Sequence, residues 1–209
     1  MKMLKLFRSS VFAGVAIGVA GFGFLASSVQ SEVYGSALGA ILFSFGLLTV
    51  VGYKLKLYTG TSGFIKSNEI ADLLLILLGN IVGCLCVALL SRVSPLEIQA
   101  KAQSLLELRL RTGALNCGLL AIGCGFIMTT AVQFARQKHY LPLLFGVPLF
   151  IVCGFPHCVA DAFYFLCVPL AFWKANLLQI LLVYLCIVLG NFVGCNLYRV
   201  ILAKDQIPS

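Results

Sequence analysis

The chain has 209 residues, of which 61% are hydrophobic and only 11% charged, and its mean hydropathy is +1.04. A soluble domain of this length is not so apolar, so the composition excludes one and indicates a polytopic membrane protein. The formal net charge of +8 comes from basic residues spread among the loops. No basic cluster of the kind that binds nucleic acid is seen, so no nucleic-acid partner is expected.

Six apolar stretches are near or above the ~20 residues that a spanning helix needs. They cover residues 9–28, 35–60, 70–91, 112–135, 140–172 and 175–203. Little chain is left outside these stretches. We therefore predict an all-α membrane protein with six transmembrane helices in one transmembrane domain, residues 1–209, embedded in the lipid bilayer.

The first stretch also has features of a signal peptide, because basic residues precede it and the segment 26–28 is suited to cleavage. Its glycines, however, form the small-residue face used in helix packing, which favours a retained helix. The basic residues are biased toward the loops that lie on the side of the N-terminus, so both termini are predicted to be cytoplasmic. We expect a location in the cell (inner) membrane.

The second stretch turns polar over residues 53–63, where glycine, threonine and serine do not continue a helix well. The fifth stretch contains Gly154 and Pro156, followed by His157 and Asp161 one helical turn apart. Ionisable groups at membrane depth are costly, so each is a functional candidate. Irregular backbone there is tolerated only inside protein or along a cavity. Helices 2 and 5 are therefore predicted to be interrupted at a pore or substrate site.

An internal repeat relates the third and sixth stretches. Residues 78–84 read Leu-Gly-Asn-Ile-Val-Gly-Cys and residues 189–195 read Leu-Gly-Asn-Phe-Val-Gly-Cys, identical at six of seven positions. Three helices per half force the halves into opposite orientation, an inverted repeat with interrupted helices at matching positions. The predicted halves are residues 9–91 and 112–203. The residues expected to pack the repeat are Gly79, Asn80, Gly83, Gly190, Asn191 and Gly194.

The connector 92–111 is predicted to be a short amphipathic helix on the outer surface. Ser94, Pro95 and Glu97 have the spacing of a helix start, with serine as the N-cap. The nine cysteines fall inside the apolar stretches, without a Cys-x-x-Cys pair, and are interpreted as small buried hydrophobic residues. No metal and no cofactor is expected.

Three motifs together resemble the formate/nitrite transporter family. Residues 46–51 and 57–59 are similar to the family's second-helix run ending in Leu-Phe-Thr, and residues 154–161 are similar to its fifth-helix motif Gly-Phe-Glu-His-Ser-x-Ala-Asn. The paired Gly-Asn-x-Val-Gly motifs lie in the helices where the family has them. The resemblance implies an aquaporin-like six-helix fold, a homopentamer, and a pore for small monovalent anions in each protomer.

The resemblance also implies roles for single residues. His157 matches the central pore histidine, and Thr59 matches the threonine of the loop that interrupts helix 2. Lys101 matches the basic residue of the connector. Asn116 or Cys117 matches an asparagine early in helix 4, with the register open by one residue.

The chain departs from the family pattern around the proposed pore. Pro156 replaces a glutamate, Lys56 an acid, Lys54 a glycine and Asp161 an asparagine. These changes alter the charge of the pore, so the substrate can differ from that of a typical member. Asp161 is free to pair with one of the two lysines.

The sequence therefore predicts a channel for the anions of weak acids such as formate, nitrite or hydrosulfide. His157 would donate a hydrogen bond or a proton to the anion, Thr59 would be a second donor, and Lys54, Lys56 and Lys101 would attract anions. Simpler roles remain open: His157 as an interhelical hydrogen-bond bridge, Lys54 and Lys56 as snorkelling residues, and the two repeat asparagines as packing residues.

Two other functions remain open from the sequence. Residues 60–63 read Gly-Thr-Ser-Gly and resemble a rhomboid protease motif, which would make Ser62 and His157 a catalytic pair. A neutral-solute channel of the aquaporin type shares the six-helix fold, but the paired Asn-Pro-Ala boxes are missing. A histidine flanked by lysines suits an anion better than a neutral solute, and the protein is not expected to be an enzyme.

Overall fold

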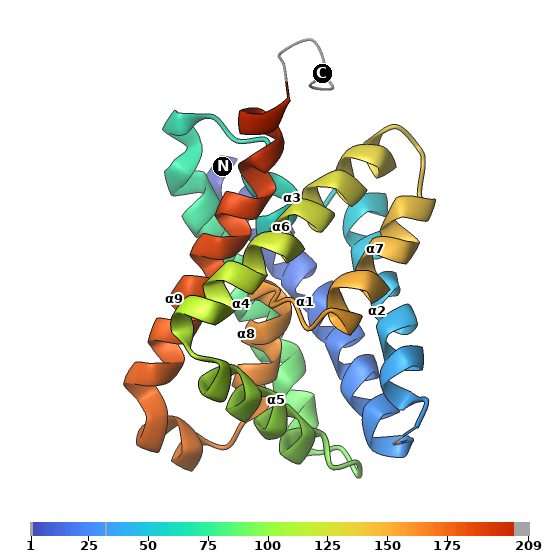
Figure 1. Cartoon of the computed structure of the whole chain (residues 1–209), viewed down its shortest axis with the longest axis vertical. Helices are drawn as coiled ribbons and strands as arrows, with labels where there is room; N and C mark the ends of the chain where they lie inside the picture. The colour runs from blue at the N-terminus through green and yellow to red at the C-terminus, as the bar shows by residue number, and fades with distance from the viewer. Residues whose placement is uncertain (1, 32, 203–209) are drawn as a thin grey trace.

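The computed structural model describes residues 2–31 and 33–202, and in them the chain is helical without a strand (Figure 1). The predicted all-α class is therefore confirmed. In chain order the helices are α1 (Lys2–Gln30), α2 (Gly35–Gly52), α3 (Tyr58–Ser62), α4 (Ile70–Ala88), α5 (Ile98–Thr112), α6 (Ala114–Arg136), α7 (Leu141–Val152), α8 (Cys158–Cys167) and α9 (Leu170–Ile201). Two short 3-10 turns, η1 (Ser67–Glu69) and η2 (Leu89–Arg92), flank α4.

Five segments within the described part of the chain are long and apolar enough to cross a membrane. They are α1, α2, α4 together with η2, α6 and α9. Helices α7 and α8 are also apolar but have only 12 and 10 residues. At about 1.5 Å per residue, neither alone crosses a hydrocarbon layer of about 30 Å.

The fifth predicted stretch ends earlier in the structure, and the sixth begins earlier. Proline disfavours helical backbone at the residue before it, and Val168, which precedes Pro169, is extended (φ −69°, ψ 143°). Helix α8 consequently ends at Cys167, and α9 begins at Leu170 rather than near residue 175. A kink at Asn176 (φ −128°, ψ 17°) then bends the first part of α9.

The connector forms helix α5, but the predicted start is wrong. Ser94 Oγ accepts a hydrogen bond from the Leu96 N–H (3.2 Å) in a local turn, and helical backbone begins only at Ile98. A serine hydroxyl that bonds two residues along the chain competes with its use as an N-cap. Helix α5 buries Ile98, Ala102 and Leu106 and packs against α8 and α1.

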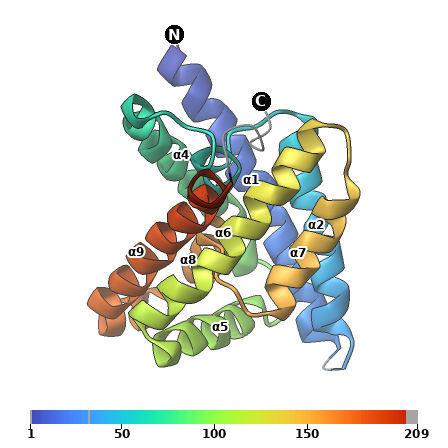
Figure 2. The ribbon, with the colours of Figure 1, turned by 45° about the horizontal axis from the view of Figure 1, so that its top comes forward.

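The two halves pack in the same way and run in opposite directions. Helix α1 packs against α2 and α4, and its counterpart α6 packs against α7 and α9. In Figure 1, α1 begins and α9 ends at the same end of the molecule, the side of the termini. Helix α1 descends from there, whereas α6 starts near α5 at the opposite end and rises. Figure 2 shows α6 lying between α9 and α7. The close packing of α1 with neighbours on both sides makes it part of the core.

Glycines of the repeated motif allow the closest helix contacts. A Cβ atom on Gly83 would lie 2.1 Å from Val11 O of α1, and a Cβ on Gly194 would lie 2.0 Å from Ile122 O of α6. Residues 11 and 122 are equivalent positions of the two halves. Gly79 and Gly190 likewise face α1 and α6. Backbones this close leave no room for a side chain, so larger residues would separate these helix pairs.

Helices α2 and α7 end in the same hydrogen-bonded turn, the Schellman motif, in which one residue takes a left-handed conformation. The Leu55 N–H donates to Val50 O (2.8 Å), and the Phe155 N–H donates to Phe150 O (2.9 Å). The left-handed residue is Gly154 (φ +67°) after α7 but Lys54 (φ +53°) after α2. Glycine adopts this conformation without strain, whereas a residue with a Cβ atom does not.

Replacing Lys54 by glycine is therefore expected to raise the free energy of unfolding by about 1 kcal/mol, because the left-handed strain disappears. Thermal or SDS-induced unfolding of the purified protein in detergent measures the change. Lys56→Gly is the matched control: it removes the same charge two residues away, where φ is not positive. A destabilised Lys54→Gly variant would contradict the assignment of strain to this residue.

Candidate functional site

Asn80 holds the segment between α2 and α3 in place. Its Oδ1 accepts a hydrogen bond from the Tyr58 N–H (2.9 Å), the first residue of α3. Its Nδ2 donates to Lys56 O (2.9 Å) and to Ser10 O of α1 (2.8 Å). The fully buried amide thus satisfies three backbone groups that would otherwise be unpaired inside the protein.

Asn191 does the same for the segment between α7 and α8. It accepts from the Cys158 N–H (2.7 Å) and donates to Pro156 O (3.0 Å) and to Ala121 O of α6 (2.8 Å). All of these partners are the repeat equivalents of those of Asn80. The two short helices α3 and α8 therefore start from equivalent, rigidly held positions in the interior.

The side chains of Thr59 and His157 meet between these two helix starts. Thr59 Oγ1 and His157 Nε2 are 2.9 Å apart, and the two residues are 0% and 2% exposed. Thr59 is the second residue of α3, and His157 is the N-cap of α8. The Phe150 ring stacks on the imidazole, with ring centroids 5.6 Å apart. The structure thus brings together the two residues that the resemblance singled out.

The hydrogen bonds of His157 define its protonation state. Nδ1 accepts from the Ala160 N–H (3.1 Å), so it carries no proton. The proton of the neutral ring therefore lies on Nε2, which donates to Thr59 Oγ1. The Thr59 hydroxyl then has its own proton left to donate, and both donors lie at one buried point.

Asp161 and Arg109 form an ion pair that holds the backbone of His157 in place. Asp161 Oδ2 accepts from the His157 backbone N–H (2.8 Å), and Oδ1 accepts from Arg109 Nε (2.9 Å). Arg109 also donates to Gly154 O (2.8 Å). Burial lowers the pKa of Arg109, but the Asp161 carboxylate outweighs this effect and holds the pKa above its usual value. Asp161 therefore pairs with Arg109 of α5, not with Lys54 or Lys56.

A cavity of about 150 Å³ lies on the α5 side of His157. Its wall includes His157, Phe155, Phe150 and the paired Arg109 and Asp161. Apart from this ion pair, whose charges cancel, and the histidine, the lining is mainly apolar. The cavity reaches the imidazole from the end of the molecule opposite to the termini.

A larger cavity of about 500 Å³ lies on the side of the termini. Leu55 and Gly60 form part of its wall, and Gly60 follows Thr59 directly in the chain. Four basic residues line it: Lys54, Lys56, Arg136 and Lys138. The Thr59–His157 contact therefore lies between a basic cavity and a nearly neutral one.

The remaining residues implied by the resemblance lie elsewhere. Asn116 is exposed on α6 and donates only to Thr112 O within its own turn. Cys117 is buried, with its thiol near Arg109 O. Neither of them lines the two cavities, and nor does Lys101 on α5. The structure does not bring these three side chains together with His157.

Arg109 is the site residue that sequence reasoning missed. A signal for it exists in α5, because Ile98, Ala102 and Leu106 form its buried stripe at helical spacing and residue 109 continues it. An arginine on a buried stripe requires a carboxylate partner. The contributions of Arg136 and Lys138 to the basic cavity were not predicted either, since both come from the end of α6, far along the chain.

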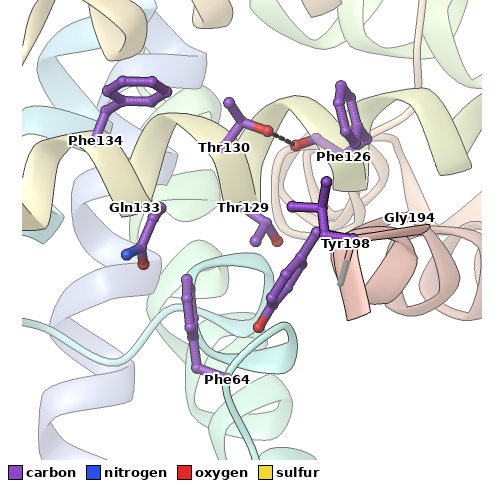
Figure 3. Close-up of a pocket in the computed structure, with 9 residues that line it drawn as sticks. Phe64, Phe126, Thr129, Thr130, Gln133, Phe134, Gly194 and Tyr198 are labelled. Atoms are coloured by element: carbon purple, nitrogen blue, oxygen red, sulfur yellow. Dashed lines mark hydrogen bonds between the residues drawn. The ribbon is translucent and has the colours of Figure 1, made fainter. Parts of the chain in front are cut away.

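A third hollow lies away from this path (Figure 3). It is a mainly apolar groove of about 170 Å³ between α6 and the end of α9, walled by Phe64, Phe126, Phe134 and Tyr198. Tyr198 anchors the segment after α3 through a hydrogen bond from its hydroxyl to Gly63 O. Neither Thr59 nor His157 reaches this groove, so it is not part of the central site.

Ser62 does not pair with His157. Its hydroxyl is buried and has no hydrogen-bond partner among the described residues, while the imidazole nitrogens are engaged by Thr59 and Ala160. A serine protease needs the base within hydrogen-bond reach of the nucleophile.

Comparisons with known proteins concern the fold and the family of the chain. No curated protein matches the chain in a sequence comparison. A solved structure described as a pentameric formate channel with formate bound superposes with a TM-score of 0.80 at 20% identity, covering 95% of this chain and 94% of that one. A structure described as an FNT family ion channel superposes with a TM-score of 0.81 at 21% identity, covering 93% of this chain and 87% of that one. The family model described as formate/nitrite transporter matches residues 1–203, so the chain belongs to the formate/nitrite transporter family.

Proposed function

We propose that the protein is a channel that passes small monovalent anions of weak acids, such as formate, nitrite or hydrosulfide, across the membrane. The observation that carries the proposal is the buried Thr59–His157 contact between two cavities, at the point where α3 and α8 begin. Membership of a transporter family supports transport rather than proteolysis. The protease alternative is wrong on both grounds.

In this proposal α7 and α8 together make the fifth of six crossings in chain order. Residues 141–167 are enough to span the bilayer with an interruption at His157, and α2 with α3 forms the equivalent crossing of the first half. The halves, residues 9–91 and 112–203, form an inverted repeat within one channel domain, 1–209. Both termini face the cytoplasm, the side rich in basic residues, and the protein lies in the cell (inner) membrane.

We further propose a homopentamer with one pore in each protomer. The fold shared with a pentameric formate channel supports this assembly. Large apolar side chains such as Ile41, Phe45 and Phe145 are exposed on α2 and α7 of the isolated chain. Lipid and neighbouring protomers together would cover such surfaces.

An anion would enter from the basic cavity, where lysines and arginine raise its local concentration. At the narrow centre it loses water, which costs several kcal/mol unless hydrogen bonds replace the lost ones. The Nε2–H of His157 and the hydroxyl of Thr59 are the two donors available there. Thr59 and His157 are both buried, and the Phe150 ring stacks on the imidazole, so these donors act in a medium of low dielectric constant.

The hydrogen bonds of His157 favour its role as a neutral donor over that of a proton source. The ring holds one proton, on Nε2, and Nδ1 is occupied by the Ala160 N–H. To become positively charged the ring must release this helix-capping bond. Transfer of a proton to the anion therefore requires a rearrangement at the start of α8, whereas a hydrogen bond from Nε2 requires only that the anion replace Thr59 Oγ1 as the acceptor.

The test is anion uptake into proteoliposomes with His157→Ala. We expect a loss of formate, nitrite or hydrosulfide flux of about 10- to 100-fold, the effect of losing a hydrogen bond to a charged group. Thr59→Val should reduce flux less, since it leaves the Nε2–H donor and the Nδ1 atom that caps α8 in place, whereas His157→Ala removes both. The matched control is Thr49→Val, whose hydroxyl bonds only Phe45 O within α2. Normal flux through a correctly assembled His157→Ala variant, or flux of glycerol instead of anions, would overturn the proposal.

A further inference from the structure

The basic cavity is built from two helix ends of the same unusual kind. After α6, as after α2, the chain makes a Schellman motif: the Lys138 N–H donates to Ala135 O (3.0 Å) and the His139 N–H to Phe134 O (3.0 Å). The left-handed residue is Lys138 (φ +66°) here and Lys54 (φ +53°) after α2. These are the two non-glycine residues with positive φ in the described part of the chain.

Both left-handed lysines line the same cavity. Each one takes a backbone conformation that costs about 1–2 kcal/mol relative to glycine, which the equivalent turn after α7 uses. Strained backbone of this kind clusters at active sites and ligand-binding sites. The two turns come from different halves of the chain, so their meeting in one cavity is not a consequence of local sequence.

The other two basic residues complete the cluster. Lys56 lies two residues after Lys54, and Arg136, the last residue of α6, lies two residues before Lys138. The Arg136 guanidinium lies over the Phe64 ring at 3.7 Å from its centroid, which holds it in place. No carboxylate is among the described residues that line the cavity. The cavity on the other side of His157, by contrast, has Arg109 neutralised by Asp161.

We propose that this cavity is a binding site for a dianionic oxyanion of the phosphate or sulfate class, which blocks permeation from the side of the termini. Four uncompensated cations hold a dianion more strongly than the monovalent substrate, because attraction scales with charge. The space of about 500 Å³ admits a tetrahedral oxyanion. A dianion loses more hydration energy than a monovalent anion at the buried Thr59–His157 contact, so it stays in the cavity instead of passing. The proposed block of permeation rests on the proposed channel function, whereas the proposed binding of a dianion does not.

Binding is tested without transport, using radiolabelled inorganic phosphate and the protein in nanodiscs of zwitterionic lipid. We expect saturable binding that weakens tenfold or more in Lys54→Gly/Lys138→Gly. This double variant relieves two strained turns, so a loss of folding does not explain a loss of binding. The control with the same change of charge is Arg111→Gln/Lys174→Gln, both exposed at the opposite end, and it should bind as the wild type does.

Absence of saturable binding, or equal weakening in both double variants, overturns the proposal. A second series of nanodiscs with anionic lipid separates two sources of the same chemistry. If lipid phosphate occupies the cavity, anionic lipid lowers the binding of free phosphate to the wild type. If free phosphate is the ligand, anionic lipid leaves its binding unchanged.

The block is tested on formate uptake into right-side-out and inside-out vesicles. Phosphate added on the side of the termini should reduce flux several-fold, and the same concentration on the α5 side should not. The proposed block is overturned if phosphate reduces formate flux equally from both sides. It is also overturned if phosphate binds to the protein but does not reduce flux from either side. A protein that binds phosphate but conducts no small anion contradicts the proposed channel and leaves the binding site in place.

Discussion

Replacement of Asn191 by leucine is expected to remove most of the folded protein. The side chain loses its bonds to the Cys158 N–H, Pro156 O and Ala121 O, and leucine leaves all three backbone groups buried without partners. Each unpaired group costs about 1–3 kcal/mol, and no water is available to replace the lost bond. The sum is comparable to the whole stability of a typical domain. The yield of monodisperse protein after detergent extraction, and its unfolding temperature, measure the loss.

Asn80→Leu should have an effect of similar size, because Asn80 bonds the equivalent three groups in the first half. Asn116→Leu is the control, since the exposed Asn116 amide makes one hydrogen bond within its own turn. Asparagine to aspartate at either buried position keeps the acceptor but places a carboxylate oxygen against two carbonyl groups. Both aspartate variants should therefore also be less stable than the wild type. Wild-type yield of either leucine variant would show that these amides do not hold the two segments.

The packing role of these asparagines could be predicted because both lie in the repeated segment of the sequence. Six identical residues of seven at 78–84 and 189–195 indicate a shared packing motif, and an amide inside an apolar helix requires partners. The partners themselves were not predictable. They are backbone groups at residues 10, 56 and 58, and at 121, 156 and 158, which have no side-chain signature.

Sequence reasoning also placed Thr59 and His157 together, by resemblance rather than by any local rule. Charge partners were harder to predict. Arg109 and Asp161 are separated by 52 positions and belong to different helices, so only the packing of α5 on α8 reveals the pair. Lys54 and Lys56, which the sequence left open as partners of Asp161, lie on the other side of the Thr59–His157 contact. The start of α5 was missed because Ser94 bonds locally instead of capping the helix.

Removal of the Asp161 carboxylate by Asp161→Ala is expected to cost about 3–5 kcal/mol, because it leaves the largely buried Arg109 guanidinium without its partner. It also frees the His157 N–H at the start of α8. The loss should appear in SDS-induced unfolding and in flux, since the histidine is no longer held. Arg109→Ala should be similarly destabilised, because it leaves a carboxylate with 1% exposure and one remaining hydrogen bond.

Asparagine at position 161 separates the two tasks of the carboxylate. In the wild type, one oxygen bonds Arg109 Nε and the other bonds the His157 N–H, so both partners are donors. An amide has one acceptor oxygen and one donor nitrogen, and it satisfies only one of the two. Asp161→Asn alone should therefore remain destabilised.

Asp161→Asn combined with Arg109→Leu should recover most of the loss, because the single amide oxygen then serves His157 alone. A coupling energy near zero between the two positions, measured by the double-mutant cycle, would show that the pair does not act as a unit. Where the family motif of the resemblance has asparagine, this chain has Asp161, whose charge is balanced by Arg109. The pair therefore brings a second charge with it and still holds the His157 N–H in place.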